Sequence, residues 1–298
     1  MRKFVTFFVF AAFVFAAVPL FAAPPSKKPQ NSEPPMLRVT PLPKTPAVKK
    51  PAAPSLHTQL VRTLSKILDK DSVQKIFSDP RLQLDRSVVA KGSGEFAPST
   101  LLTPASIDRG KEFIQRNEWL MGEAERKWKV DREVVAAIIR VETNFGKHLG
   151  SRSVLNTLYS IYILNPKKRD FAFKELVAFL DLAERYHWDH FEIKGSISGA
   201  IGIPQFIPTS YNRFAIDANN DGRADLFDEA DAVNSVAYYL AIHGWGERFD
   251  QKRKAVFAYN HSWDYVDDVL SYAWALKKPT PVQYWHEEEK EKQVEVVP

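Results

Sequence analysis

The stretch from Asp131 to Gly150 constrains the fold of this chain most, because its apolar residues recur at the spacing of one helical face. That face consists of Val135, Ile138, Ile139 and Glu142. Asp131 is a candidate N-cap, and Gly146 is a candidate left-handed residue after the helix end. The run VVAAII is also compatible with a buried strand, but the two end residues and the Ala pair favour a helix. The pattern therefore predicts a helix that carries a carboxylate on its buried side.

Glu142 is a candidate proton donor because it lies on that apolar stripe. Glu is rarely buried without a partner, and burial raises the pKa of its carboxyl group. The C-terminal end of its own helix acts in the same direction. Such a carboxyl group can hold a proton near neutral pH and give it to a leaving group. The alternative is a Glu at the edge of the stripe, paired with a Lys or Arg.

Helical spacing recurs along the rest of the chain, and no segment alternates in the way that a sheet requires. Further helices are expected near residues 56–68, 71–77, 106–127, 173–183, 233–240 and 266–273. The last of these should end at Lys277, Lys278 and Pro279. The fold class is therefore mostly α.

The chain begins with features of an export signal. A basic start precedes an apolar run over residues 4–21 and the small residues Ala22 and Ala23, so residues 1–22 are expected to be a signal peptide or an uncleaved anchor. Residues 23–54 contain ten prolines and are typical of an extended linker.

The remaining chain is expected to hold one folded region and a tail. The folded region covers residues 55–276, with an N-terminal helical part over 55–100 and a core over 101–276. Residues 277–298 are expected to form a charged, disordered tail.

Charge and cysteine content exclude several classes of function. The net charge is +5, but residues 1–54 carry +7 and the remainder carries −2. The folded region is therefore near neutral, and nothing favours nucleic acid, which calls for a basic face on the domain. A membrane is expected to be contacted only through the N-terminal segment. The absence of Cys excludes disulfides, thiol catalysis, thiolate metal sites and the lipid anchor of a bacterial lipoprotein.

Residues 217–228, DANNDGRADLFD, have the spacing of a twelve-residue calcium loop. Oxygen-bearing residues occupy its positions 1, 3, 5, 9 and 12, which are Asp217, Asn219, Asp221, Asp225 and Asp228. Gly222 stands at position 6, where the loop turns sharply. Position 12 is Asp rather than the usual Glu, which shortens its reach. The alternative is an Asn/Asp/Gly turn that ends in Asp228 as the cap of the next helix.

The segment GSISGAIGIPQFIPTSY over residues 195–211 is a candidate ligand-binding loop. Its glycines allow close backbone approach, but it lacks the spacing of a phosphate-binding loop. Ser196 and Gln205 stand among apolar neighbours, which suggests a floor that hydrogen-bonds a ligand. Tight packing of small residues is the alternative. The tetrapeptide Tyr259-Asn260-His261-Ser262 near the chain end is a weak signal by itself.

Taken together, these segments resemble the soluble catalytic domain of the membrane-bound lytic transglycosylase B family, also called family 3. The resemblance covers roughly residues 100–275 and includes VETNFG, KGSISGAIGIPQFIPTSY, the calcium loop and YNHS. It implies a lysozyme-like helical catalytic domain with an N-terminal helical lobe, one EF-hand-like calcium loop and Glu142 as the catalytic acid/base. It further implies a sugar groove lined by Ser196, Gln205, Tyr239, Tyr259 and Asn260. The implied ligands of a single structural calcium are Asp217, Asn219, Asp221, the Arg223 carbonyl and Asp228.

The implied activity is non-hydrolytic cleavage of the bond between N-acetylmuramic acid and N-acetylglucosamine in peptidoglycan, which leaves 1,6-anhydromuramic acid ends. The implied location is the periplasm or cell envelope, with glycan strands as substrate and the cell-wall synthesis machinery as a candidate partner. Lys167 and Lys168 stand where lipoprotein members carry paired arginines for the peptide stem. Lys keeps the charge but lacks the planar fork, so the stem preference stays open. A hydrolytic muramidase and a catalytically inactive glycan-binding protein are the alternatives.

Overall fold

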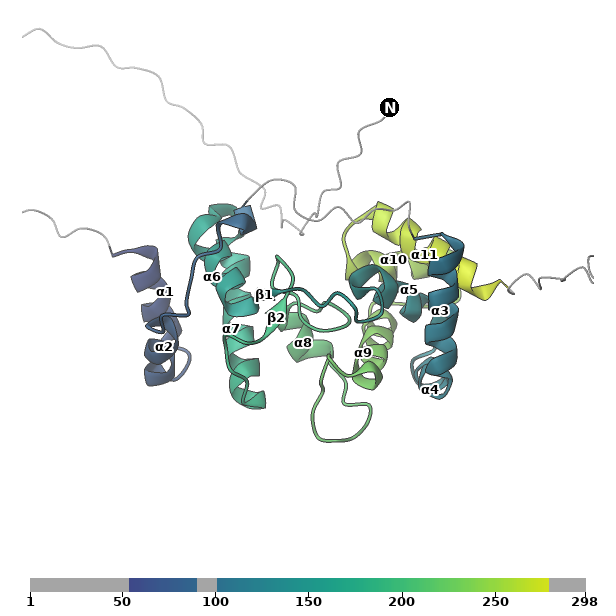
Figure 1. Ribbon diagram of the computed structural model, residues 1–298, viewed down its shortest axis with the longest axis horizontal. Coiled ribbons are helices and arrows are strands. Elements are labelled where there is room, and N and C mark those ends of the chain that lie inside the picture. The colour runs from purple at the N-terminus through teal and green to yellow at the C-terminus, as the bar shows by residue number, and fades with distance from the viewer. Residues whose placement is uncertain (1–53, 90–100, 279–298) are drawn as a thin grey trace, which may run out of the picture.

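The computed structural model describes residues 54–89 and 101–278, which form helices joined by loops and one very small sheet (Figure 1). In chain order the α-helices are α1 (Leu56–Leu64), α2 (Lys70–Phe77), α3 (Pro104–Arg116), α4 (Glu118–Trp128), α5 (Arg132–Thr143), α6 (Val154–Leu164), α7 (Arg169–Tyr186), α8 (Pro208–Phe214), α9 (Glu229–Ile242), α10 (Phe249–Tyr259) and α11 (Trp263–Lys277). Two 3-10 turns are η1 (Arg86–Val89) and η3 (Pro166–Lys168). The strands β1 (Arg152–Ser153) and β2 (Lys194–Gly195) pair antiparallel, with Arg152 opposite Gly195. The mostly α prediction is confirmed.

The predicted signal segment, the linker up to residue 53 and the tail from residue 279 lie outside the described residues. Among the helices that are described, none combines the length and the apolar character needed to cross a membrane.

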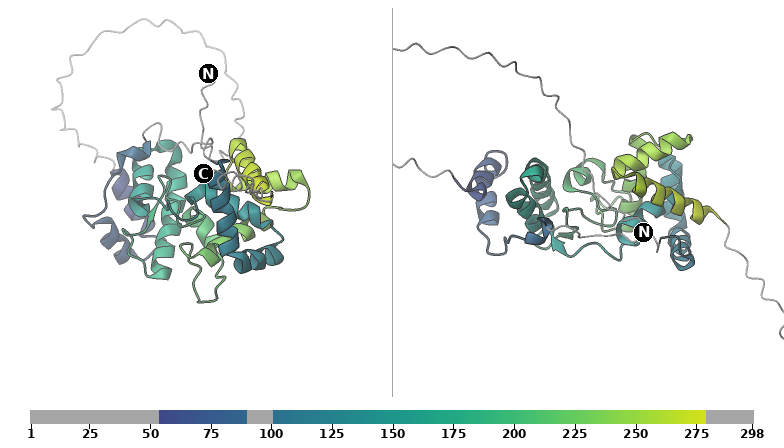
Figure 2. Two further views of the ribbon diagram at one scale, coloured as in Figure 1. Left: turned by 45° about the vertical axis from the view of Figure 1, so that its right-hand side comes forward. Right: turned by 90° about the horizontal axis from the view of Figure 1, so that it is seen from above.

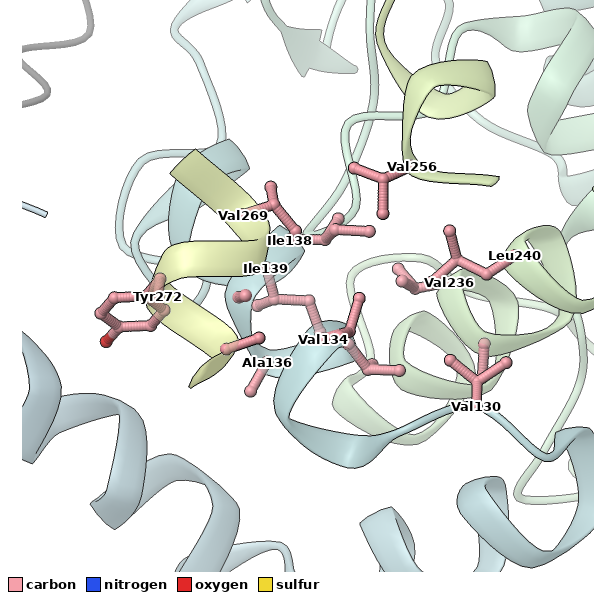
Figure 3. Close-up of a cluster of buried hydrophobic side chains, with 14 of the residues drawn as sticks. Val130, Val134, Ala136, Ile138, Ile139, Val236, Leu240, Val256, Val269 and Tyr272 are labelled. Atoms are coloured by element: carbon pink, nitrogen blue, oxygen red, sulfur yellow. The ribbon is translucent and has the colours of Figure 1, made fainter. Parts of the chain in front are cut away.

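The helices form two groups around two hydrophobic cores. In Figures 1 and 2, α1, α2, α6 and α7 lie at one end and α3, α4, α5, α9, α10 and α11 at the other, with β1, β2 and α8 between them. The α5 group packs around α5, whose residues 134–140 are all buried (Figure 3). This complete burial explains the run VVAAII: a helix that contacts neighbours on every side needs apolar residues all round.

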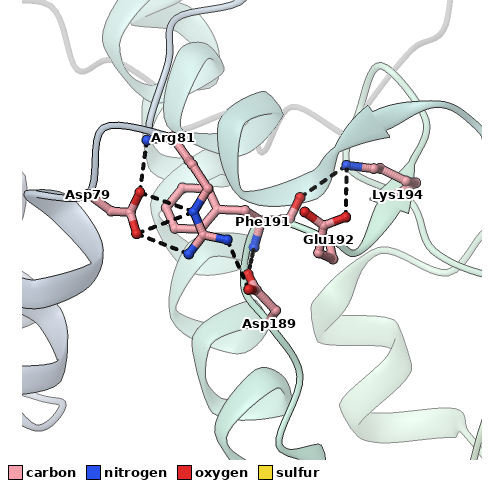
Figure 4. A network of polar contacts seen from close by, with 6 residues as sticks. All are labelled: Asp79, Arg81, Asp189, Phe191, Glu192 and Lys194. Carbon is pink, nitrogen blue, oxygen red and sulfur yellow. Dashed lines mark hydrogen bonds and ion pairs between the residues drawn. The ribbon is translucent and has the colours of Figure 1, made fainter.

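The second core joins the two N-terminal helices to α6, α7 and the chain from residue 191 to residue 226. A polar network at its surface fixes the loop after α2 to the segment before β2 (Figure 4). The guanidinium of Arg81 binds Asp79 and Asp189 and lies 4.4 Å from the ring centre of Phe191. Exposed ion pairs contribute little alone, but this planar fork also covers an aromatic ring. The network therefore holds β2, and with it the loop that follows β2, against the N-terminal helices.

The helix predicted over residues 106–127 is instead two helices, which meet at Asn117. Asn117 leaves the helical conformation, and its side-chain amide donates to the carbonyl of Phe113, which ends α3. The break turns α4 onto α9, so that Met121 and Ala124 still enter the core, as the apolar spacing predicts.

Asp131 is the N-cap residue of α5 and Gly146 is left-handed with φ of 79°, as predicted, but each end differs in one detail. The helix stops at Thr143, three residues before Gly146, because Asn144 already takes the left-handed conformation with φ of 51°. Asp131 stands at the N-cap position and its carbonyl accepts the N–H groups of Val134 and Val135, but its side chain accepts no hydrogen bond from the helix. Its carboxylate instead accepts hydrogen bonds from Lys252 at 2.9 Å and Lys277 at 2.8 Å, which ties the start of α5 to α10 and α11.

Three helices lie where no helix was predicted. The first, α6, is apolar on almost every side, so its residues give no helical period. A second is α8, a short helix within the Gly- and Pro-rich segment that begins at Pro208. The third is α10, which fills most of the stretch between the Gly244 turn and Tyr259.

Replacing Asp131 by Asn should lower the free energy of unfolding by about 1–2 kcal/mol at pH 7, since hydrogen bonds to charged groups are lost. Burial raises the pKa of Asp131, but Lys277 and Lys252 together outweigh it, so the pKa lies below its ordinary value of 3.8. A lowered pKa adds stability above the unfolded-state pKa, and this stability is lost as pH falls through the folded-state pKa.

Denaturant unfolding should therefore show a smaller difference in stability between the Asp131→Asn variant and the unsubstituted protein at pH 3 than at pH 7. An Asp108→Asn variant, at an exposed position on α3, is the control. A difference that is the same at both pH values would contradict this account.

Candidate active site

Glu142 lies in the last turn of α5, and its side chain contacts α11. The hydroxyl of Tyr265 donates a hydrogen bond of 2.7 Å to Glu142 Oε1. Burial raises the pKa of Glu142 from 4.5 to about 7, and the Tyr265 hydrogen bond only partly opposes this rise. Glu142 as a whole residue is half-buried. This confirms the prediction that burial would raise the pKa of Glu142.

Tyr265 is the partner of Glu142 that the sequence reading missed. It lies on the buried side of α11 and is 8% exposed. Burial, together with the nearby Glu142 charge, raises the pKa of the Tyr265 hydroxyl well above its ordinary value, so it acts as a fixed donor. The sequence does contain a pattern that places Tyr265 on the buried side of this helix, because Tyr265 is four residues before Val269 on the apolar stripe.

The turn after Glu142 is fixed to the loop that precedes α8. Thr143 is buried, and its hydroxyl donates to the carbonyl of Ile203 at 2.9 Å. The same oxygen accepts the backbone N–H of Gly146 at 3.0 Å. Asn144 and Phe145 have positive φ angles of 51° and 60°, which turn the chain sharply away from the helix. The end of α5 is thereby locked to the Gly-rich loop.

The loop over residues 195–206 is folded by its own polar side chains. The Ser196 hydroxyl accepts the backbone N–H groups of Ser198 and Ala200. A side chain at Gly150 would meet the Gly195 carbonyl at 2.1 Å, so this close approach requires glycine. The predicted close packing around the glycines is therefore present.

Gln205 joins this loop to the chain that follows Glu142. Its backbone is left-handed with φ of 52°, and its side-chain amide donates to the carbonyls of Gly202 at 2.8 Å and Leu149 at 3.3 Å. The amide therefore fixes two loops relative to each other, and Gln205 is partly exposed.

Tyr239 and Tyr259 belong to an aromatic cluster beside Glu142. Their ring centres are 4.9 Å apart, and Tyr259 lies parallel to Tyr265 at 6.4 Å. Tyr259 donates to the Pro204 carbonyl at 2.6 Å, and Tyr239 donates to the Ala258 carbonyl at 2.8 Å. These two tyrosines, Tyr265 and Glu142 therefore form one group, which lies where the two hydrophobic cores meet.

Two further aromatic residues support this cluster and were not predicted. Phe206 lies 5.7 Å from Tyr239 and 5.8 Å from Tyr259, and His243 stacks on Tyr239 with ring centres 4.0 Å apart. His243 lies just before Gly244, which is left-handed with φ of 87°.

The other predicted groove residues are not all in this group. Asn260 follows Tyr259 at the end of α10, and its carbonyl accepts the backbone N–H of Ser262. Lys167 and Lys168 lie in η3 between α6 and α7, at the surface of the other helical group. No hydrogen bond or ion pair described within residues 54–89 and 101–278 joins Lys167 to the Glu142 group.

The predicted calcium loop is a compact turn that its own oxygen atoms hold. The Asp217 carboxylate accepts the backbone N–H groups of Asp221 and Gly222, and the Asn219 side chain accepts that of Asp221 at 3.0 Å. Gly222 has φ of 91°, as the sharp turn requires. The carboxylate of Asp221 in turn accepts the N–H of Arg223.

The second half of the loop is joined to α9. Asp228 caps this helix by accepting the N–H groups of Ala230 and Asp231. Asp231 is completely buried and accepts the N–H groups of Ala218 at 2.8 Å and Asp225 at 2.6 Å, so it connects both halves of the loop. Across the described part of the chain, no three acidic or His side chains gather into a ready metal site.

Burial raises the pKa of four carboxyl groups among the described residues: Glu142, Glu175, Asp231 and Asp268. The hydrogen-bond partners of the first three separate their roles. Glu175 accepts both the backbone N–H and the hydroxyl of Thr209, and it thereby holds the start of α8. Asp231 holds the loop before α9. Glu142 alone of the three is bound by a single side-chain hydroxyl and no backbone N–H. Among the described residues no second carboxylate acts on it, so the site offers one proton-transferring carboxyl group.

Comparison with known proteins identifies relatives of this chain. The family model of the transglycosylase SLT domain matches residues 62–293. The chain is 31% identical over 189 residues to the membrane-bound lytic murein transglycosylase B of Escherichia coli strain K12. This match covers 63% of the chain and 52% of the relative, so it spans about half of the relative's length.

Solved structures that share the fold include the following two. The Escherichia coli lytic transglycosylase SLT35 in complex with calcium has a TM-score of 0.67 at 23% identity, covering 74% of this chain and 92% of that one. The Pseudomonas aeruginosa protein SltB3, in complex with NAG-anhNAM-pentapeptide, has a TM-score of 0.66 at 22% identity, covering 76% and 80%. At these identities the likeness shows the fold, and the predicted lysozyme-like helical architecture agrees with it.

Replacing Glu142 by Gln should raise the stability of the protein at pH 8 relative to the unsubstituted chain. A carboxyl group whose pKa is raised from 4.5 to about 7 on folding destabilises the folded state as pH rises through this interval. The advantage of Gln should therefore grow by about 2–3 kcal/mol between pH 4 and pH 8 in denaturant unfolding. Glu112→Gln, at an exposed position on α3, should show no such growth. An advantage that does not change with pH would mean that Glu142 is not buried as described.

Proposed function

This chain belongs to the transglycosylase SLT domain family, and we propose that it is a peptidoglycan lytic transglycosylase. It would cleave the β-1,4 bond between N-acetylmuramic acid and N-acetylglucosamine without water. The related structure bound to NAG-anhNAM-pentapeptide supports this substrate class, because that fragment contains an anhydro sugar.

The observation that carries the proposal is the setting of Glu142. Its pKa of about 7 gives a carboxyl group that is about half protonated at neutral pH, as an acid/base catalyst requires. Glycosidases that hydrolyse their substrate generally use two carboxyl groups roughly 5–10 Å apart. The single carboxyl group found among the described residues at this site favours a reaction that needs only one.

In the proposed reaction Glu142 first protonates the oxygen that links the two sugars. The bond from this oxygen to C1 of the muramic acid breaks, and the acetamido group of the same sugar stabilises C1. The Glu142 carboxylate then accepts the proton of the C6 hydroxyl as the oxygen attacks C1 and closes the anhydro ring. Tyr265 can donate to the carboxylate during the interval in which it is charged. The proton returned by C6 restores the acid.

The polar groups around Glu142 would hold the C6 hydroxyl where water would otherwise attack. Attack from the same sugar has an effective concentration of roughly 10⁵ M or more when the geometry is right, far above that of water. We assign this positioning to Tyr239, Tyr259, Asn260, Gln205 and Ser196. The side chains of Tyr239, Tyr259, Gln205 and Ser196 bind backbone carbonyls and N–H groups, which supports the role because these bonds fix the loops on which the sugar would rest. Asn260 is assigned with them because it directly follows Tyr259.

The peptide stem and the cellular location follow from the same proposal. The exposed Lys167 offers a positive charge to a stem carboxylate, with Lys168 beside it. Export to the periplasm or cell envelope is supported by the apolar run over residues 4–21. Glycan strands would be the substrate, with the cell-wall synthesis machinery as a candidate protein partner.

We also propose one structural calcium in the loop from Asp217 to Asp228. The support is the spacing of its oxygen-bearing residues, the turn at Gly222 and the related structure that contains calcium. Asp217, Asn219, Asp221, the Arg223 carbonyl, Asp225 and Asp228 would hold it. Bound calcium would supply charge compensation among these oxygens and stiffen the loop before α9, and no step of the reaction uses it.

Digestion of purified peptidoglycan should yield fragments that end in 1,6-anhydromuramic acid, each lighter by one water than a muramidase product. The reason is that the C6 hydroxyl replaces water as the attacking group. Mass analysis of the digest checks this, with Glu142→Gln as the matched control. That variant should lose at least roughly 10²–10⁴-fold in turnover, since general acid catalysis is removed.

Each alternative has its own product pattern. Reducing ends that borohydride converts would replace the transglycosylase with a muramidase. Peptidoglycan that is bound but left intact would favour the glycan-binding protein without activity. A Glu142→Gln variant with half of the original rate would remove Glu142 from the mechanism.

Calcium should raise the melting temperature of the protein, because a ligand that binds only the folded state stabilises it. The gain is about 2.7 kcal/mol when free calcium is a hundredfold above Kd. Asp217→Ala combined with Asp221→Ala should abolish the gain, whereas Asp170→Ala, at an exposed position on α7, should keep it. Identical melting curves with calcium and with chelator would rule the site out.

A further inference from the structure

Two exposed tryptophans mark the outer side of α11. Trp263 is 51% exposed and Trp274 is 62% exposed, although tryptophan is usually well covered. They are eleven residues apart, which is about three helical turns, so they lie on one side of the helix and roughly 16 Å apart. The exposed residues Asp267 and Ser271 lie between them. We call these four residues the outer α11 face.

The opposite side of α11 is the side that packs into the hydrophobic core. It packs against α5, α3 and α10, and it consists of Tyr265, Val266, Val269, Tyr272, Ala273 and Leu276. The two tryptophans therefore do not contribute to the α5 core, and a structural role in that core does not account for them.

Trp263 is held in place rather than free. Its ring stacks on Phe257 with centres 4.4 Å apart and an angle of 25°, and the Arg253 guanidinium lies 5.1 Å from its centre. Arg253 is fixed by an ion pair with Asp267. At the other end, Lys278 lies over the ring of Trp274. Rings that are already ordered lose little conformational freedom when they bind a ligand.

The N-terminal end of the outer α11 face lies next to the α10–α11 connection, which also carries the tyrosines of the Glu142 group. Trp263 precedes Tyr265, the partner of Glu142, by two residues, and Phe257 precedes Tyr259 by two residues. The short connection between α10 and α11 therefore presents tyrosines inward to the groove and aromatic rings outward to solvent. Trp263 is therefore the member of the outer α11 face that stands nearest in sequence to the Glu142 group.

The charges around the tryptophans decide between possible occupants. Asp264 and Asp267 are exposed beside Trp263, and Asp267 already pairs with Arg253. Arg253 and Lys278 contribute positive charges beside the two rings, so the surface carries both signs. An anionic membrane requires a predominantly basic surface, which this mixture does not provide. A protein partner usually needs a continuous apolar patch, whereas Asp267 and Ser271 interrupt this one. A pyranose ring matches both features, because its C–H face can lie on an aromatic ring while its hydroxyls bind Asp and Ser.

We propose that the outer α11 face is a second saccharide-binding surface, which holds the peptidoglycan strand outside the catalytic groove. This inference rests on the proposed function for the identity of the polymer. The surface would keep a long strand attached between successive cleavages, and a fragment that fills only the groove would not use it.

The test measures binding separately from cleavage. In the Glu142→Gln background, Trp263→Ala combined with Trp274→Ala should weaken cosedimentation with insoluble peptidoglycan about tenfold or more, as expected when buried aromatic anchors are removed. Affinity for a soluble disaccharide-peptide fragment should be unchanged. The matched control is Trp119→Ala, which removes a 77% exposed tryptophan from α4. Trp263→Tyr with Trp274→Tyr should retain most of the binding, and equal melting temperatures would show that all variants fold.

Two results would overturn the inference. The first is a double Ala variant that binds insoluble peptidoglycan as well as the Trp119→Ala control does. The second is a loss of binding to phosphatidylglycerol vesicles, with peptidoglycan binding intact, which would assign the face to a membrane. Either result leaves the product analysis, and hence the proposed function, untouched. The reverse outcome is also distinguishable. If peptidoglycan binding requires these tryptophans but the protein releases no product, only the proposed activity is contradicted.

Discussion

The hydrogen bond from Tyr265 to the Glu142 carboxyl group, made where the two hydrophobic cores meet, is the interaction on which this structure depends. Among the described residues it is the only donor to that group, so burial dominates and the pKa rises to about 7. More donors would stabilise the charge and return the pKa toward 4.5. Full exposure of the Glu142 carboxyl group to water would also return its pKa toward 4.5. The site therefore combines an apolar setting with a single hydroxyl donor.

The surrounding elements keep this arrangement from relaxing. Thr143 binds the Ile203 carbonyl, and Gln205 binds the Leu149 carbonyl, so the chain after α5 and the Gly-rich loop form one unit. Tyr259 reaches the same loop through the Pro204 carbonyl. On the far side of the loop, Glu175 holds the start of α8. These side chains hold the backbone around the site by binding its N–H and carbonyl groups. Within the described part of the chain Glu142 has no such structural bond, so its carboxyl group is free for proton transfer.

Much of this could be predicted from local sequence patterns. The helix α5 with Glu142 in its last turn follows from helical spacing, and the turn at Gly222 follows from the loop residues. Contacts between distant segments could not be predicted. Tyr265 is 123 residues from Glu142, and no period in the sequence relates the two. The sequence predicts that the Asp131 side chain caps α5, but its carboxylate instead accepts hydrogen bonds from lysines of α10 and α11.

The protonation state of Glu142 is the central claim, and it can be measured directly. The carboxyl carbon of Glu142, labelled with ¹³C and followed by NMR across the pH range, should titrate with a midpoint near 7. In a Tyr265→Phe variant the midpoint should move higher, because the hydrogen bond that favours the charged form is gone. A midpoint near 4.5 in the unsubstituted protein would contradict the account, since the carboxyl group would then be fully ionised at neutral pH and could not act as the acid.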